Sequence, residues 1–230
     1  MKLVLATRNP HKARELAAML DLGLPVLTMT EIGFPGEIRE DGKTFEKNAR
    51  IKLLAAGDFL ARKKDDADSG ACCLVADDSG LEVDALAGAP GVWSARYAGP
   101  SADDKTNLQK LLREMKDVPG PKRAARFRCV LAARWLPQPP VLSGKLTFQH
   151  SQECWNVSGW SGGDEVVFEG VCEGKIGFKP KGENGFGYDP VFFPEGSCRT
   201  FAEMGSGEKN RISHRARAAD KLKKWLKPAV

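Results

Sequence analysis

The sequence predicts an α/β fold, and three observations carry this prediction. A short apolar run at residues 2–6 is followed by a segment with helical spacing of apolar residues. A second amphipathic segment precedes another apolar run at residues 72–76, and strand-like stretches dominate the second half. With 230 residues, 42% apolar and 28% charged, the chain can bury a full core and is not disordered. We expect a single domain over residues 1–230.

The first elements are a buried strand at residues 2–6 and a helix after a short loop. Asn9 is a good N-cap, and Pro10 suits the first helical position because its missing N–H is not needed there. The helix is expected to bury one apolar face, formed by Ala13, Leu16, Ala17 and Leu20.

The next elements are a second helix and a central strand. Thr44 is the expected helix cap, and the apolar face continues for about four turns through Phe45, Ala49, Leu53, Ala56 and Leu60. Residues 72–76 form a continuous apolar run that is typical of a central strand. We expect this strand to end in the polar sequence Asp77-Asp78-Ser79-Gly80.

The second half predicts two further helices and several strands. An amphipathic helix is expected over residues 103–115 and a strand over residues 126–135. Residues 137–170, with three prolines near their start, indicate an inserted extended hairpin. Thr200 begins a capping box, and Ser213 caps a last helix whose inward-facing residues are Ala219, Leu222 and Leu226.

Composition narrows the class of protein. The six cysteines show no zinc spacing, and in a chain of this size they are expected to be free thiols. No apolar run is long enough for a membrane span or a signal peptide, so we expect a cytoplasmic protein without a membrane partner. The net charge of +5 suits nucleic acid and a phosphorylated small molecule equally well.

The loop before the first helix is a candidate anion site. The free N–H groups of a helix N-terminus point at this loop, and Arg8 and Lys12 add positive charge. The alternative is an ordinary helix start with solvated basic residues. The chain contains no phosphate-binding Gly-x-x-x-x-Gly-Lys-Ser/Thr motif and no dinucleotide-binding motif after a strand.

Asp77 and Asp78 are a candidate metal site. Two adjacent carboxylates repel each other unless a cation compensates, and Mg²⁺ is commonly held by one or two carboxylates with substrate phosphates and water. The alternative is a polar turn in which Asp is favoured for its backbone hydrogen bonds. Glu40 could supply a further carboxylate, or it could be a solvated loop residue.

Two groups in the second half could bind a nucleoside. At residues 186–190, nearby glycines allow close approach of a ligand, and Phe186 or Tyr188 could stack on a purine ring; the alternative is a glycine-rich turn with core aromatics. Residues 208–215 place three basic side chains around a helix start, and the alternative is a solvated basic stretch. These side chains are Lys209, His214 and Arg215.

Taken in order, these groups resemble the inosine triphosphate pyrophosphatase family, also called the non-standard purine nucleoside triphosphate pyrophosphatases. The resemblance covers nearly the whole chain. Its motifs are Leu-Ala-Thr-Arg-Asn-Pro-His-Lys at 5–12, Gly-Lys-Thr-Phe-Glu-Lys-Asn-Ala at 42–49, Ala-Asp-Asp-Ser-Gly-Leu at 76–81, Gly-Ala-Pro-Gly-Val-Trp-Ser-Ala-Arg-Tyr at 88–97, Phe-Gly-Tyr-Asp-Pro-Val-Phe at 186–192 and Ile-Ser-His-Arg at 212–215.

The resemblance implies an elongated α/β structure with two lobes around a nucleotide cleft, usually in a homodimer. It implies Mg²⁺-dependent hydrolysis of inosine, deoxyinosine and xanthosine triphosphates to monophosphate and pyrophosphate. The implied triphosphate ligands are Thr7, Asn9 and Lys12, with Lys52 nearby, and we expect the intervening loop residues Arg8, Pro10 and His11 to belong to the same substrate site. Glu40 and Asp78 are the implied metal ligands, and Asp78 is also the implied proton acceptor. The implied nucleoside site is formed by Ser79, Phe186, Gly187, Tyr188, Asp189, Lys209, His214 and Arg215.

Two departures from the family pattern stand out. Arg8 lies where many relatives carry a small residue, and the stretch at 137–170 is longer than the family leads us to expect. An alternative function is hydrolysis of modified pyrimidine or other abnormal nucleotides by the same triphosphate machinery. A nucleic-acid-binding protein is a further alternative, but Glu40, Asp77 and Asp78 would repel a phosphate backbone, so we expect no stable nucleic-acid binding.

Overall fold

The computed structural model describes residues 1–62, 72–136, 155–156 and 165–226. The chain divides into two compact units. Unit 1 comprises Met1–Asp78, Val130–Glu169 and Ala219–Val230, and unit 2 comprises Ser79–Cys129 and Gly170–Ala218. The chain therefore crosses from one unit to the other between Asp78, an expected metal ligand, and Ser79, an expected nucleoside ligand.

The sheet is mixed, and this confirms the predicted α/β class. Its strand order is β2-β1-β3-β4-β6-β5, and β7 also pairs with β6. β1 is parallel to β2 and to β3, whereas β5 and β7 are antiparallel to β6. The strands are β1 (Lys2–Leu5), β2 (Val26–Thr28), β3 (Cys72–Val83), β4 (Ala124–Leu136), β5 (Trp155–Asn156), β6 (Val166–Ile176) and β7 (Phe192–Pro194).

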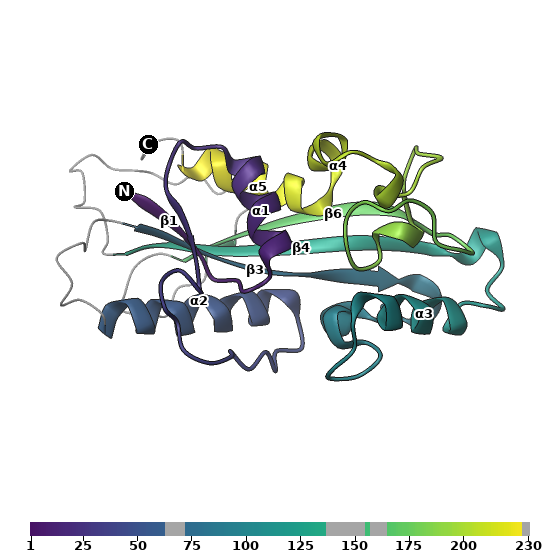
Figure 1. The fold of residues 1–230 in the computed structure, drawn as a ribbon, viewed down its shortest axis with the longest axis horizontal. Coiled ribbons are helices and arrows are strands. Elements are labelled where there is room, and N and C mark those ends of the chain that lie inside the picture. The colour runs from purple at the N-terminus through teal and green to yellow at the C-terminus, as the bar shows by residue number, and fades with distance from the viewer. Residues whose placement is uncertain (63–71, 137–154, 157–164, 227–230) are drawn as a thin grey trace. The chain divides into compact units, whose positions relative to one another are not determined.

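In unit 1, helices α1 (Pro10–Leu20) and α2 (Phe45–Arg62) lie on opposite sides of the strands (Figure 1). The strand order explains this arrangement. From β1 the chain moves outward to β2 through α1, and then returns past β1 to β3 through α2. Because crossovers between parallel strands are right-handed, two crossovers in opposite directions place their helices on opposite faces.

The caps of these helices are as predicted. Asn9 Oδ1 accepts hydrogen bonds from the N–H groups of His11 and Lys12, and Pro10 occupies the first turn of α1. Thr44 Oγ1 accepts from Lys47 N at the start of α2. Both helices bury the expected apolar face, except that Ala17 and Leu60 are only half-buried.

The predicted end of the central strand at residues 77–80 is wrong, because β3 continues to Val83. Leu81 and Val83 are fully buried, so apolar packing continues beyond the polar residues and keeps the backbone extended. The turn considered for Asp77 and Asp78 is therefore absent. The two carboxylates instead project from opposite faces of one strand, since successive side chains of a strand alternate.

Unit 2 contains α3 (Asp104–Glu114), α4 (Ser206–Ile212) and the first turn of α5 (His214–Leu226). Asp103 caps α3, Thr200 forms the predicted capping box, and Ser213 Oγ accepts from Ala216 N at the start of α5. The core of unit 2 gathers aromatic residues around β4, among them Phe127 of that strand and Tyr188, Phe192 and Phe201 from later in the chain.

Two sequence predictions fall partly outside the described residues. Most of the hairpin predicted at 137–170 lies there, although β5 pairs with β6 through Trp155–Val167 and Asn156–Val166. The sixth cysteine, Cys154, also lies there. The other five are free thiols, as predicted: Cys72, Cys73, Cys129, Cys172 and Cys198.

Candidate active site

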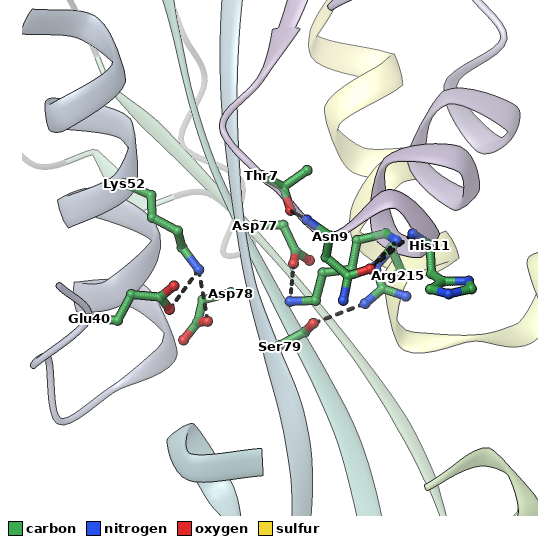
Figure 2. A network of polar contacts seen from close by, with 10 residues as sticks. Thr7, Asn9, His11, Glu40, Lys52, Asp77, Asp78, Ser79 and Arg215 are labelled. Carbon is green, nitrogen blue, oxygen red and sulfur yellow. Dashed lines mark hydrogen bonds and ion pairs between the residues drawn. The ribbon is translucent and has the colours of Figure 1, made fainter. Parts of the chain in front are cut away.

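The loop between β1 and α1 is held by its own polar side chains. Thr7 Oγ1 accepts from Asn9 N at 3.1 Å, and Asn9 Oδ1 accepts from His11 N at 2.9 Å and from Lys12 N at 3.2 Å (Figure 2). These two side chains therefore shape the loop and cap the helix. The structure brings together the residues from Thr7 to Lys12 that we expect in the substrate site.

Arg8, the residue that departs from the family pattern, has a contact of its own. Its Nη2 donates to the carbonyl oxygen of Phe34 at 2.7 Å, and the contact is exposed. Arg14, one turn into α1, donates to the Pro10 carbonyl and contacts His11 Nδ1 at 3.2 Å. Basic side chains thus surround the start of α1, where the helix dipole already favours an anion.

Lys12 is paired with Asp77. Its Nζ lies 2.5 Å from Asp77 Oδ1, and the Asp77 side chain is 1% exposed. Lys12 belongs to α1, which covers one face of the unit 1 strands. Asp77 therefore holds the lysine of the predicted triphosphate loop, on the opposite face of β3 from Asp78.

Asp78 faces α2 and belongs to a second charged cluster with Lys52 and Glu40. Lys52 Nζ donates to Asp78 Oδ1 at 3.0 Å and to Glu40 Oε2 at 2.9 Å (Figure 2). Lys52 and Asp78 are buried, whereas 29% of the Glu40 side chain is exposed. The resemblance pairs Glu40 with Asp78 as metal ligands, and the fold adds Lys52 between them through one helix, one strand and the loop before the helix.

In this cluster two carboxylates share one ammonium group, so the positive charge does not fully balance the negative charge. Burial raises the pKa of the Asp78 carboxyl, Lys52 and Lys12 only partly offset this, and the Glu40 carboxylate raises the pKa further. Burial on its own would lower the pKa of Lys52, but Asp78, Glu40 and Asp77 outweigh burial and raise it. The lysine therefore stays charged, while Asp78 accepts a proton more readily than an exposed aspartate.

The residues present fit a bound divalent cation at Asp78. Its second oxygen, Oδ2, is buried and has no hydrogen-bond partner among the described residues. Carboxylate oxygens are the ligands that Mg²⁺ prefers, with substrate phosphates and water completing the set. In the described part of the chain, no group of three or more His, Cys, Asp and Glu side chains could hold a metal without such help.

In unit 2, the segment at residues 186–189 is anchored by Asp189. Asp189 Oδ2 accepts from Phe186 N at 2.9 Å and from Lys209 Nζ at 2.6 Å, and both charged side chains are buried. A Cβ on Gly185 would lie 2.1 Å from Asp189 Oδ2, and Gly185 has a φ of +76°. Only glycine fits there.

The two aromatic residues of this segment differ in accessibility. Tyr188 is buried in the core of unit 2, and its hydroxyl donates to the Ser94 carbonyl at 2.9 Å. Phe186 is half-buried, with Lys209 Nζ 4.9 Å from its ring centroid. Of the two candidates for stacking on a base, Phe186 therefore presents the more accessible ring.

The basic stretch at 208–215 is not solvated, so that alternative is wrong. Lys209, His214 and Arg215 are all buried, because residues 206–212 form the unpredicted helix α4 and turn at Ser213 into α5. Arg215 Nη2 donates to Ser79 Oγ at 2.9 Å (Figure 2). The His214 ring stacks on Phe127 with centroids 4.7 Å apart.

One anchoring contact of this group was not indicated by the sequence. Asp104, in the first turn of α3, accepts from Gly187 N at 2.8 Å. Asp104 is distant in sequence from residues 186–189, and an acidic residue in the first turn of a helix has a sufficient local explanation in the helix dipole. No pattern in the sequence singled it out.

Comparison with known proteins decides the family. The model of the Ham1 family matches residues 3–225. The chain belongs to the Ham1 family.

Ham1 relatives match it over nearly their whole length. The chain is 42% identical over 229 residues to a dITP/XTP pyrophosphatase of Bacillus licheniformis, covering 99% of both chains. It is 46% identical over 229 residues to a dITP/XTP pyrophosphatase of Desulforamulus reducens, covering 98% of this chain and 96% of the relative. The structure of a HAM1 protein from Coxiella burnetii superposes with a TM-score of 0.76 at 34% identity, covering 99% of both chains.

The described residues of this Ham1 chain include no helix that is both long and apolar enough to cross a membrane.

Proposed function

We propose that this chain hydrolyses inosine, deoxyinosine and xanthosine triphosphates to nucleoside monophosphate and pyrophosphate, with Mg²⁺ as cofactor. The reaction would remove abnormal purines from the nucleotide pool. The observation that carries the proposal is the charged cluster of buried Lys52 and Asp78 with half-buried Glu40, in which Asp78 Oδ2 has no partner among the described residues. The names of the Ham1 relatives support the choice of substrate.

Hydrolysis at the α-phosphorus needs an activated water molecule, and Asp78 is suited to accept its proton. Burial raises the pKa of this carboxyl, so it accepts a proton more readily than an exposed aspartate would. Glu40 and Asp78 would hold Mg²⁺, which supplies positive charge against the phosphate oxygens when bound. Lys52 keeps both carboxylates in place by donating to each.

The triphosphate would bind at the start of α1. Lys12 offers a cation there, and Asp77 restrains its otherwise flexible side chain. As pyrophosphate leaves, negative charge gathers on it, so a fixed ammonium group interacts more strongly in the transition state than in the bound substrate. The N-terminus of α1 adds its dipole to the same charge.

The base would be recognised by residues of unit 2. Phe186 offers a ring for stacking, and Lys209, His214 and Arg215 supply donors. Inosine and xanthosine carry a keto oxygen where adenosine carries an amino group. A donor directed at the keto oxygen would be left unpaired by adenosine, which costs about 1–3 kcal/mol when the donor is buried.

The homodimer and the cytoplasmic location remain predictions, as does the absence of stable nucleic-acid binding. The dimer can be tested by analytical ultracentrifugation of the full chain, in which a single monomeric species at micromolar concentration would contradict it.

The proposed activity is tested with a panel of nucleoside triphosphates, with pyrophosphate and phosphate measured separately in the presence and absence of Mg²⁺. We expect Mg²⁺-dependent pyrophosphate release from the inosine, deoxyinosine and xanthosine substrates, and much slower release from adenosine triphosphate. Release of phosphate in place of pyrophosphate would contradict the reaction. Preference for modified pyrimidine nucleotides would support the alternative function.

A further inference from the structure

Asn48 on α2 takes no part in the proposed chemistry, yet it makes a specific contact beside it. The residue is 1% exposed, and its Oδ1 accepts a hydrogen bond from the backbone N–H of Gly42 at 2.8 Å. This contact ties the loop that precedes α2 back onto the helix. It is distinct from the Thr44 cap, which uses Lys47 N.

The loop lies very close to the helix at this point. A Cβ on Gly42 would lie 2.6 Å from Asn48 Oδ1, 2.8 Å from Lys47 Cβ and 3.0 Å from Asn48 N. Two of these three atoms belong to the backbone or to the base of a side chain and cannot simply rotate away. Gly42 therefore allows a close approach that any larger residue would prevent.

Asn48 and Lys52 fix the two ends of one short segment. They are four residues apart and so share a face of α2. Lys52 holds the side chain of Glu40, and Asn48 holds the backbone of Gly42 two residues later. Because 29% of the Glu40 side chain is exposed, the ion pair with Lys52 restrains the carboxylate only weakly, and fixing the backbone at Gly42 restrains it further.

We propose that Asn48 is a positioning residue, which places the Glu40 carboxylate for the divalent cation by anchoring Gly42. This inference rests on the proposed function, in which Glu40 is a metal ligand. The second polar atom of Asn48 supports it: Nδ2 is buried without a hydrogen-bond partner in the described part of the chain. An apolar residue would avoid that unsatisfied donor, so stability of the helix alone does not account for asparagine here.

The experiment measures binding of Mn²⁺ to the full chain and its variants by electron paramagnetic resonance of the free ion, first with Mn²⁺ alone and then with a non-hydrolysable inosine triphosphate analogue present. Loss of a group that orients a metal ligand weakens metal binding by about 10–100-fold. We expect Asn48→Ala to raise the Kd for Mn²⁺ by at least about 10-fold. Asn48→Asp keeps an oxygen for Gly42 N–H and should bind no more weakly than the wild type.

Asn107 provides a matched control in unit 2. It is 2% exposed, and its side chain likewise anchors backbone, accepting from Ala98 N at 2.7 Å and donating to the Ala95 carbonyl at 3.1 Å. Asn107→Ala should lower the melting temperature without changing the Kd for Mn²⁺. If Asn48→Ala does not fold, Gly42→Ala perturbs the same contact and should weaken Mn²⁺ binding in its place.

The outcomes separate this inference from the proposed function. Wild-type protein that binds no Mn²⁺, either alone or together with a non-hydrolysable inosine triphosphate analogue, would overturn both. Tight wild-type binding with an unchanged Kd in folded Asn48→Ala would overturn the positioning role alone, as would equal weakening in Asn48→Asp. The positioning role would be established if folded Asn48→Ala had a raised Kd for Mn²⁺ while its KM for inosine triphosphate at saturating metal changed little.

Discussion

Removing the Lys52 ammonium group should destabilise the fold in a pH-dependent way. Lys52→Met keeps much of the side-chain volume and deletes the charge that lies 3.0 Å from Asp78 and 2.9 Å from Glu40. Asp78 is 6% exposed, so its carboxylate would be left buried without the cation that offsets this burial most, with Lys12 also lowering its pKa. Breaking a buried pair by removing one partner costs about 3–5 kcal/mol.

The sign of the pH dependence follows from Asp78. Burial already raises its pKa in the folded protein, and loss of Lys52 should raise the pKa further. A carboxyl whose pKa is higher folded than unfolded stabilises the protein below the unfolded pKa, and this stability is lost as the pH rises through the folded value. The variant should therefore be most destabilised at pH 8 and should recover as the pH falls toward 5.

Thermal unfolding at both pH values, followed by tryptophan fluorescence, measures the effect. For a chain of this size, a loss of 3–5 kcal/mol lowers the melting temperature by about 6–20 °C at pH 8. Lys47→Met, at an exposed position of the same helix, is the control and should change stability by less than about 0.5 kcal/mol. Equal destabilisation of Lys52→Met at pH 5 and pH 8 would refute the reasoning.

Four further outcomes are expected. Asp78→Asn should remain folded by circular dichroism and lose at least about 10²-fold in kcat, because it removes a metal ligand and the general base; near wild-type turnover would exclude that role. Lys12→Ala should raise KM and lower kcat together in steady-state assays, and an unchanged KM would count against a contact with the triphosphate. Arg215→Ala should narrow the preference for inosine over adenosine triphosphate in kcat/KM by about 1–3 kcal/mol; loss of both activities by one factor would place Arg215 outside base recognition. Burial raises the pKa of the Cys172 thiol to about 11, so iodoacetamide at pH 8 should label the exposed Cys198 far faster by mass spectrometry, and comparable rates would show that Cys172 is accessible.

Local patterns in the sequence were enough to predict most helices and their caps. Asn9, Thr44, Thr200 and Ser213 act as caps because a cap depends on side chains only two or three residues away. The α/β class followed from the same patterns. These features need little information from distant parts of the chain.

The course of β3 and the burial of the basic residues could not be predicted this way. Four polar residues in a row favour a turn locally, but Leu81 and Val83 pack in the core of unit 2 and keep the strand extended. Asp77 pairs with Lys12 of α1, and Asp78 pairs with Lys52 of α2. Both pairs form because α1 and α2 cover opposite faces of the strands, and the strand order sets this arrangement. The seven-residue helix α4 is too short to show a clear apolar period.

The anchors at Asn48 and Asp104 were missed for a similar reason. Each accepts a hydrogen bond from the backbone N–H of a glycine. Nearly every residue carries a backbone N–H, so the sequence does not show which one a side chain will bind. Gly42 and Gly187 belong to the motifs that carried the resemblance, but their partners became visible only in the fold.

The proposed reaction at the α-phosphorus is tested most directly by hydrolysis of inosine triphosphate in ¹⁸O-labelled water, with the products analysed by mass spectrometry. Water activated by Asp78 and directed at the α-phosphorus places the label in inosine monophosphate and leaves the released pyrophosphate unlabelled. Label in pyrophosphate would show attack at the β-phosphorus and would contradict the account.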